Sequence, residues 1–262
     1  MLRSLCLVVL LGGCVGNAGP RPETAADSLA VRIVEASGGF DAFTSLPTLR
    51  FDWAVVRDTQ EVVRRRHLWD RAGDRYRMEW PGGVDSTYVA LFQPGAFDAD
   101  TPTGSVALSV AGGAPQALGG EPLAEELRGA YERYINDAYW LLAPLKMMDP
   151  GVRRALAPDS GAAVLAVSFD GVGLTPGDRY WITTDPTSGA MTRWTFQLEG
   201  DTTTGVWDWS QPESIQTPRG PLLLPTVKAT PNGSRMILTQ PMPVPTDASV
   251  WTDLAPRLAP GT

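Results

Sequence analysis

The spacing of apolar residues changes twice along this chain, and these changes restrict the folds that it can adopt. From Leu49 to Val110, and again from Val164 to Gln240, apolar and polar residues alternate with a period of two, which is typical of strands with one buried face. Between these stretches, residues 122–142 follow the 3.6-residue spacing of an amphipathic helix. Consecutive strands joined by short turns form an antiparallel meander. We therefore predict an α+β fold, in which helices interrupt one large, curved antiparallel sheet.

Further elements lie outside the alternating stretches. An amphipathic helix is predicted over Ala25–Ser37, where Leu29 and Ile33 share one face, and a short helix is expected near Ala248. The segment Ala111–Gly120 is small and rich in glycine, which favours a mobile loop. No change of composition divides the region that alternates. We therefore expect a single half-barrel domain over residues 25–262.

The run Tyr134–Val152 joins the two alternating stretches. It begins as the end of the central helix, and Pro144 and Pro150 then prevent a continuous helix, because proline lacks an amide donor and restricts the residue before it. Met147 and Met148 lie in the bent part, and flexible thioethers suit either a core or an adaptable apolar surface. The run is thus expected to be a lid helix and its hinge, with Leu145, Met147 and Met148 turned towards the concave side of the sheet.

The first residues indicate export. Arg3 is followed by the short apolar run Leu5–Leu11 and by Gly12-Gly13-Cys14, which is typical of a signal peptide over residues 1–13. Leu-Gly-Gly-Cys resembles the bacterial lipobox, and this resemblance implies acylation of Cys14, with residues 14–24 as a tether rich in glycine and proline. Val15, rather than aspartate, after the cysteine favours the outer membrane, facing the periplasm. An ordinary secretory signal with an incidental cysteine is the alternative.

Charge and residue types exclude several classes of function. The net charge of −7 argues against a nucleic-acid partner, because such binding depends on clustered Lys and Arg. Arg64-Arg65-Arg66 cannot form a one-sided patch in a strand, and a solvated edge strand is expected there. His67 is the single histidine and no cysteine follows Cys14, so a His/Cys metal site is excluded. No nucleophile-elbow or phosphate-binding glycine motif occurs. We predict neither an enzyme nor a cofactor.

Aromatic residues are the other unusual feature. Nine tryptophans are present, and several lie on the apolar faces of predicted strands. They either fill a core or line a concave apolar groove, which is the kind of surface where hydrophobic ligands bind. The predicted ligand-binding residues are Trp53, Met78, Trp80, Trp140, Leu145, Met147, Met148, Trp194 and Phe196.

Two motifs resemble a known family. The pattern Tyr-Ile-Asn-Asp-x-Tyr-Trp-Leu-Leu-x-Pro-Leu-Lys-x-x-Asp-Pro-Gly-Val spans residues 134–152, and Val-Gly-Leu-Thr-Pro-Gly-Asp-Arg-Tyr-Trp spans residues 172–181. Both resemble bacterial lipoproteins of unknown function that are similar to the outer-membrane lipoprotein-sorting (LolA/LolB-like) group. The resemblance covers roughly residues 25–228. It implies an unclosed β-barrel whose concave side is covered by helices and holds acyl chains, and it implies no catalytic residue.

Two functions follow as expectations. The first is a periplasm-facing lipoprotein, anchored to the membrane through Cys14, that binds a lipid or a lipoprotein acyl chain in its half-barrel. A chain anchored in this way cannot shuttle across the periplasm, so a holding or accepting role is expected. The second is a structural lipoprotein with a filled core that docks to an envelope protein partner.

Overall fold

The computed structural model of the chain describes residues 21–158, 164–169 and 177–259. The predicted signal peptide 1–13, Cys14 and most of the tether lie outside the described residues. Part of the motif at 172–181 lies outside them as well.

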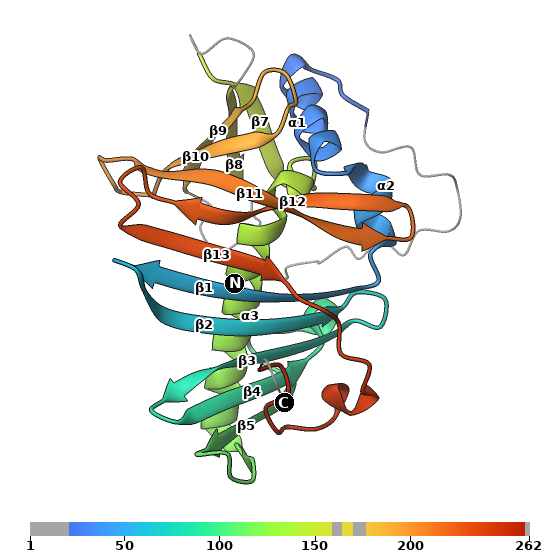
Figure 1. The fold of residues 1–262 in the computed structure, drawn as a ribbon, viewed down its shortest axis with the longest axis vertical. Helices are drawn as coiled ribbons and strands as arrows, with labels where there is room; N and C mark the ends of the chain where they lie inside the picture. Colours follow the sequence, from blue (N-terminus) through green and yellow to red (C-terminus); the bar gives the residue numbers. More distant parts are fainter. Residues whose placement is uncertain (1–20, 159–163, 170–176, 260–262) are drawn as a thin grey trace, which may run out of the picture.

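One antiparallel sheet contains all thirteen strands of the described residues, in the order β6-β5-β4-β3-β2-β1-β13-β12-β11-β10-β9-β8-β7 (Figure 1). The strands are β1 (Thr48–Arg57), β2 (Gln60–Asp70), β3 (Arg75–Gly83), β4 (Ser86–Phe92), β5 (Gly104–Val110), β6 (Gln116–Ala117), β7 (Val152–Leu156), β8 (Val164–Phe169), β9 (Arg179–Thr184), β10 (Met191–Gln197), β11 (Gly205–Thr217), β12 (Gly220–Ala229) and β13 (Arg235–Pro241). The sheet is not closed, because β6 and β7 form its two edges. The predicted α+β class with a large antiparallel sheet is confirmed.

The two alternating stretches of the sequence form the two halves of this sheet. Strands β1–β6 make one meander and β7–β13 make the other. The halves join where β1 pairs with β13, from Phe51 opposite Pro241 to Arg57 opposite Arg235. The last strand of the chain therefore completes the sheet beside the first one.

Two short helices pack on the inner face of the second half. The helix α1 (Ala25–Ala36) begins with a capping box, in which the Thr24 hydroxyl accepts from the Asp27 amide and the Asp27 carboxylate accepts from the Thr24 amide. Gly38 separates α1 from α2 (Gly39–Ser45) with a φ of +107°. A Cβ at this position would lie 2.3 Å from the Pro221 carbonyl oxygen, so only glycine permits this approach to β12.

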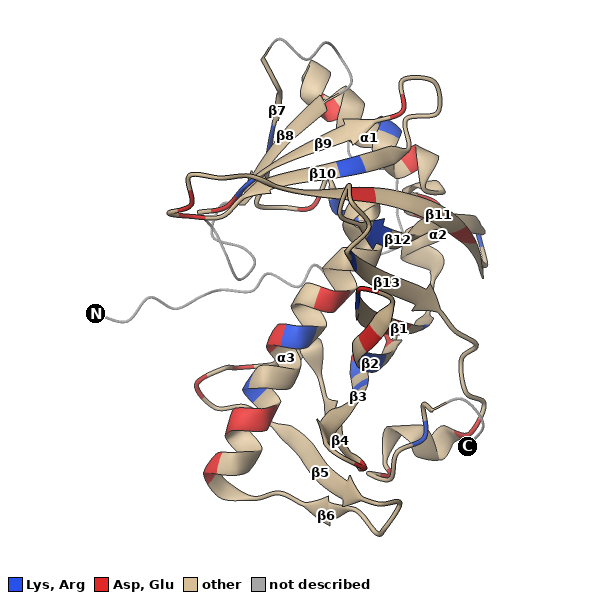
Figure 2. Ribbon diagram, turned by 60° about the vertical axis from the view of Figure 1, so that its left-hand side comes forward, with Lys and Arg blue, Asp and Glu red and all other residues tan. Residues whose placement is uncertain are grey.

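The helix α3 (Gly120–Leu142) connects the two edges of the sheet and crosses its inner face, behind the strands in Figure 1. Charged residues follow it along its length in Figure 2. Its early part packs in one hydrophobic cluster with β3, β4 and β5, and its last turns pack in a second cluster with α1 and the second half of the sheet. A 3₁₀ turn, η2 (Ala143–Lys146), follows at once. No helix among the described residues is both long and apolar enough to cross a lipid bilayer.

The inner face is filled by side chains. Leu145 and Met147 are completely buried in the second cluster, and Met148 packs against it. The bent segment after α3 therefore turns towards the sheet as predicted, and in this structure it contributes to the core. Each fully buried side chain of this size contributes about 1.5–3 kcal/mol to stability.

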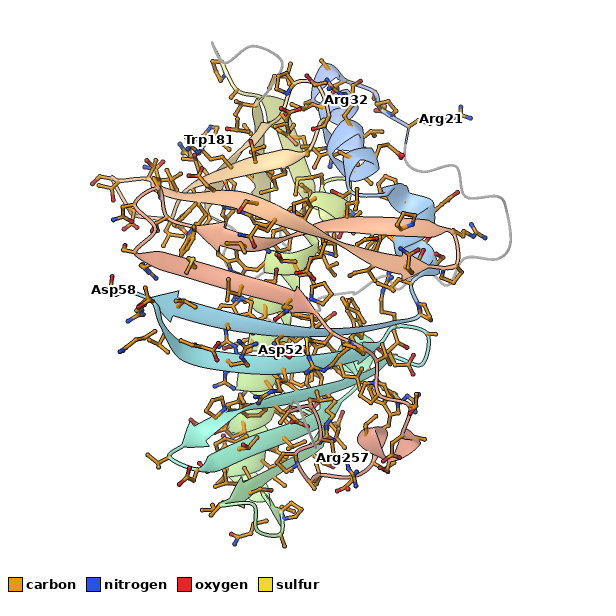
Figure 3. The ribbon with its side chains drawn as sticks, viewed as in Figure 1. Arg21, Arg32, Asp52, Asp58, Trp181 and Arg257 are labelled. Carbon is orange, nitrogen blue, oxygen red and sulfur yellow. The ribbon has the colours of Figure 1, made fainter. Side chains whose placement is uncertain are left out.

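The outer face of the sheet is not simply a polar surface exposed to solvent. Residues 247–259, which we call the C-terminal segment, cross the outer side of β1–β3, and Figure 3 labels Arg257 on it and Asp52 near the middle of the sheet. The predicted helix near Ala248 is a single 3₁₀ turn, η4 (Ala248–Trp251). The segment covers charged residues that a solvated face would expose: Arg50, Asp52, Arg77 and Glu79 are all buried.

Two other expectations are wrong in detail, and one strand was not expected. The strand that carries Arg64-Arg65-Arg66 is not an edge strand, since β2 lies between β1 and β3. The glycine-rich segment 111–120 contains the short strand β6. The edge strand β7 was not predicted, because Val152–Leu156 contains two adjacent arginines and no alternating apolar pattern.

Candidate functional site

Seven aromatic side chains form a continuous layer between the end of α3 and the second half of the sheet. We call this layer the aromatic cluster; it consists of Tyr139, Trp140, Phe169, Tyr180, Trp194, Trp207 and Trp209. The Trp140 ring lies 5.5 Å from Trp207 and 6.0 Å from Trp209, and Trp194 lies 5.8 Å from both Trp209 and Tyr139. Such edge-to-face and offset contacts add about 0.5–1.5 kcal/mol per pair beyond area burial.

The predicted ligand-binding residues do not all meet at this layer. Those that pack in the hydrophobic cluster around it are Trp53, Trp140, Leu145, Met147, Met148, Trp194 and Phe196. Met78 and Trp80 lie instead in the other cluster, under the early part of α3. The reason is that β3 belongs to the first half of the sheet, whereas the end of α3 covers the second half.

Three buried polar atoms in this region have no hydrogen-bond partner. They are the indole nitrogens Nε1 of Trp53 and Trp209 and the hydroxyl of Tyr139. Buried side-chain polar groups in native proteins nearly always have at least one partner. The inner face thus carries hydrogen-bonding capacity that the fold itself does not use.

A buried ion pair holds α3 on the sheet. Asp137 is completely buried, and its carboxylate accepts a hydrogen bond from Arg65 at 2.7 Å. Its second oxygen lies 2.6 Å from Arg65 Nε and 3.2 Å from His67 Nε2. His67 also bonds the Tyr76 hydroxyl through Nδ1 at 2.9 Å, and its ring stacks on Phe51. These contacts connect one turn of α3 to β1, β2 and β3.

His67 acts here as a structural link. Burial lowers the pKa of its imidazole, although Asp137 opposes that shift. A neutral ring that accepts a hydrogen bond from the Tyr76 hydroxyl at Nδ1 carries its hydrogen on Nε2, which lies 3.2 Å from the Asp137 carboxylate oxygen. Its zero exposure leaves no route by which a substrate would reach it in this state.

The buried imidazole predicts a loss of stability in mild acid. Unfolded histidine titrates near pH 6.5, whereas the folded pKa lies lower, so below about pH 6.5 the unfolded chain binds a proton that the folded chain does not. The free energy of unfolding should fall by up to about 1.4 kcal/mol per pH unit in that window and be constant just above it. Urea unfolding at pH 7.5, 6.5 and 5.5 measures this slope. An NMR titration of the single imidazole with an ordinary midpoint near 6.5 would contradict the prediction.

Two buried charged residues can be recognised from their spacing in the sequence. Lys228 shares the buried side of β12 with Leu222 and Leu224, at even spacing from both. Asp137 follows Ala130 by seven residues on the apolar side of α3. A charged residue at a position whose period places it in the core is the pattern that identifies both.

Two surface hollows lie in the second half of the sheet, and one of them is lined in part by Tyr180 of the aromatic cluster. One of about 300 Å³ is lined by residues around Arg179 and Glu199, and one of about 250 Å³ lies between Arg153 and Trp181. In the described part of the chain, no group of three or more His, Cys, Asp or Glu side chains is placed to hold a metal ion. Because side chains fill the inner face of the sheet, a ligand there would have to displace side chains of α3 or of the segment that follows it.

Similarity to known proteins is found among solved structures. No protein-family model matches the chain, and no curated protein matches its sequence. A DUF1329 family protein from Desulfovibrio piger is similar at 10% identity and a TM-score of 0.41, over 86% of this chain and 94% of that one. A LolA superfamily protein from Nitrosomonas europaea is similar at 9% identity and a TM-score of 0.38, over 87% and 97%.

A third similar structure is an outer membrane lipoprotein-sorting protein domain from Vibrio parahaemolyticus, at 6% identity and a TM-score of 0.38, over 85% of this chain and 97% of that one. The last two belong to the group that the motifs of residues 134–194 resemble. Because all three TM-scores lie below 0.5, the function proposed below rests on the residues of this chain.

Proposed function

We propose that this chain is a non-catalytic envelope lipoprotein that binds a hydrophobic molecule, a lipid or an acyl chain, on the inner face of its half-barrel. The acylated Cys14 anchors it to the outer membrane, and the domain faces the periplasm. The ligand lies against the aromatic cluster, and the last turns of α3 with the Met-rich segment move to admit it. Trp53, Trp140, Leu145, Met147, Met148, Trp194 and Phe196 contact the ligand.

The observation that carries the proposal is the aromatic cluster with its unpartnered polar atoms. A core selected only for stability would pair Trp53 Nε1, Trp209 Nε1 and the Tyr139 hydroxyl, since a buried unpaired group costs about 1–3 kcal/mol. These atoms stand beside a broad apolar surface that one helix end covers. Residues that break a packing rule without local compensation are expected at functional sites.

A second candidate is a structural lipoprotein that docks to an envelope protein through its outer surface. The filled inner face favours it, because the described residues already bury one another there. In this case no small molecule occupies the half-barrel, and the unpartnered atoms have no ligand.

Lipid extraction distinguishes the two candidates. The full chain with Cys14→Ser should leave the membrane fraction and, when purified without detergent, should yield a bound hydrophobic molecule to solvent extraction and mass spectrometry. Trp140→Ala should reduce the bound amount several-fold, because it removes a half-buried wall of the aromatic cluster.

Trp251→Ala is the matched control, since Trp251 is also half-buried but lies on the C-terminal segment at the outer face. It should leave the bound amount unchanged. A Cys14→Ser protein that carries no hydrophobic molecule, together with a specific protein partner recovered by crosslinking in cells, would reject ligand binding and support the second candidate.

A further inference from the structure

A lysine is buried on the inner face without a carboxylate. Lys228 on β12 has no exposed surface, and its ammonium donates to the Pro225 carbonyl at 2.6 Å and to the Thr239 hydroxyl. Its Nζ lies 4.7 Å from the centre of the Trp209 ring. Among the described residues, no aspartate or glutamate forms an ion pair with it. An ammonium has three donors, so one of them is left without an acceptor in this arrangement.

Neighbouring side chains add further donors. Trp209 on β11 stands directly opposite Lys228, and Trp53 on β1 stands directly opposite Thr239 on β13. Both indole Nε1 groups are buried and have no acceptor. Four adjacent strands thus carry Lys228 and two unused N–H donors on the inner face; we call Trp53, Trp209, Lys228 and Thr239 the donor patch. The unused donors of this patch lack an acceptor, and an anion satisfies them best.

The donor patch adjoins the aromatic cluster and is covered by the end of α3. Trp140 stacks on Trp209 at 6.0 Å, and Trp194 lies on the other side of Trp209 at 5.8 Å. The same movement that admits a hydrophobic molecule to the aromatic cluster would therefore uncover the patch. A ligand with a charged end and a hydrocarbon chain fits both surfaces at once.

We propose that the donor patch binds the carboxylate of a fatty acid whose chain lies on the aromatic cluster. When protonated, Lys228 carries one positive charge, which matches the single negative charge of a carboxylate. The inference rests on the proposed function and narrows it from hydrophobic molecules in general to acids with one chain.

Burial of Lys228 lowers the stability of the protein. Burial holds the pKa of Lys228 well below its usual range. Below the unfolded value of about 10.4, the unfolded chain therefore binds the proton more tightly than the folded chain, and stability at neutral pH is reduced. Replacement of Lys228 by an apolar residue of similar length should raise the denaturant midpoint and remove the partner of the anion. A gain in stability together with a loss of binding is typical of functional residues.

Binding by the full chain with Cys14→Ser, after removal of bound lipid, tests the inference. Palmitic acid and hexadecanol are titrated separately, and tryptophan fluorescence reports the dissociation constants. Lys228→Met should weaken the binding of palmitic acid about 10- to 100-fold, which is the range for the loss of a hydrogen bond to a charged group. The same substitution should change the dissociation constant of hexadecanol less than about twofold, and it should raise the urea midpoint of unfolding. Arg193→Met, which removes an exposed cation paired with Asp208 at the surface of β10, should change neither constant.

Trp209→Phe provides a second variant that keeps the aromatic packing but removes one N–H donor. This variant should weaken the binding of palmitic acid several-fold and leave the dissociation constant of hexadecanol unchanged. If the unsubstituted protein binds both compounds equally and Lys228→Met alters neither constant, the carboxylate site is rejected while hydrophobic binding stands. If it binds neither compound, both the site and the proposed function are rejected.

Discussion

Asp137→Asn is expected to lower the free energy of unfolding by about 3–5 kcal/mol, the range for breaking a buried ion pair by removing one partner. The substitution leaves the Arg65 guanidinium without its counter-ion where only 16% of its side chain is exposed. It also removes the negative charge that lies 3.2 Å from His67 Nε2. Urea unfolding followed by circular dichroism measures the change. Because Asp137 joins α3 to the sheet, binding of a hydrophobic dye to the folded protein should rise as well.

Glu126→Gln is the control on the same helix. Glu126 pairs with Arg133 at 3.8 Å, and both side chains are about one third exposed, so solvent screens the pair. This change should alter stability by less than about 0.5 kcal/mol. An equal effect of the two substitutions would show that the buried pair does not fasten α3.

Arg77→Met is expected to cost about 3–5 kcal/mol and to release the C-terminal segment from the outer face. The buried guanidinium donates to the carbonyls of Val250 at 3.0 Å, Asp253 at 2.6 Å and Ala255, and to Glu79 at 2.8 Å. Glu79 in turn accepts from the amides of Arg257 and Leu258. Without Arg77, Glu79 loses its counter-ion, and three carbonyls lose the guanidinium that donates to them.

Limited proteolysis and urea unfolding test this expectation together. The Arg77→Met protein should be cut within residues 242–259 at a protease concentration that leaves the unsubstituted protein intact. Arg193→Met serves as the control, because Arg193 is about half exposed and pairs with Asp208 at the surface of β10. It should remain resistant and lose less than about 1 kcal/mol. A C-terminal segment that resists cleavage in Arg77→Met would mean that Val250 and Leu258 alone retain it.

The regular elements could be predicted because their causes are local. Alternation located Thr48–Arg57 and Met191–Gln197, and the 3.6-residue spacing from residue 122 located α3. Strand β7 and the 3₁₀ turn η4 were missed or misassigned, since both depend on partners distant in the sequence. Val152–Leu156 is a strand because it pairs with β8 at the edge of the sheet.

The candidate site could be predicted only in part. Trp53, Trp140 and Trp194 were recognised as inward-facing aromatic residues, and the structure places them around one hydrophobic cluster. Met78 and Trp80 could not be separated from them, because a period of two assigns a face but not a position across the sheet. Lys228 lies at an even spacing from Leu224, which places it on the buried side of β12, but this spacing does not show which side chains surround it.

The sequence by itself determined most of the strands, the central helix and the inward direction of the aromatic side chains, since these follow from the spacing of apolar residues along the chain. Only the tertiary structure decided which strand pairs with which, that the C-terminal segment covers Arg77 and Glu79, and that Trp53, Trp209 and Lys228 meet beneath Trp140. The physical reason is that burial of a charge depends on partners separated by many residues, and no local pattern records them. The run Tyr134–Val152 illustrates both parts: its sequence specifies a helix end, and its fold supplies the surface that this helix end covers.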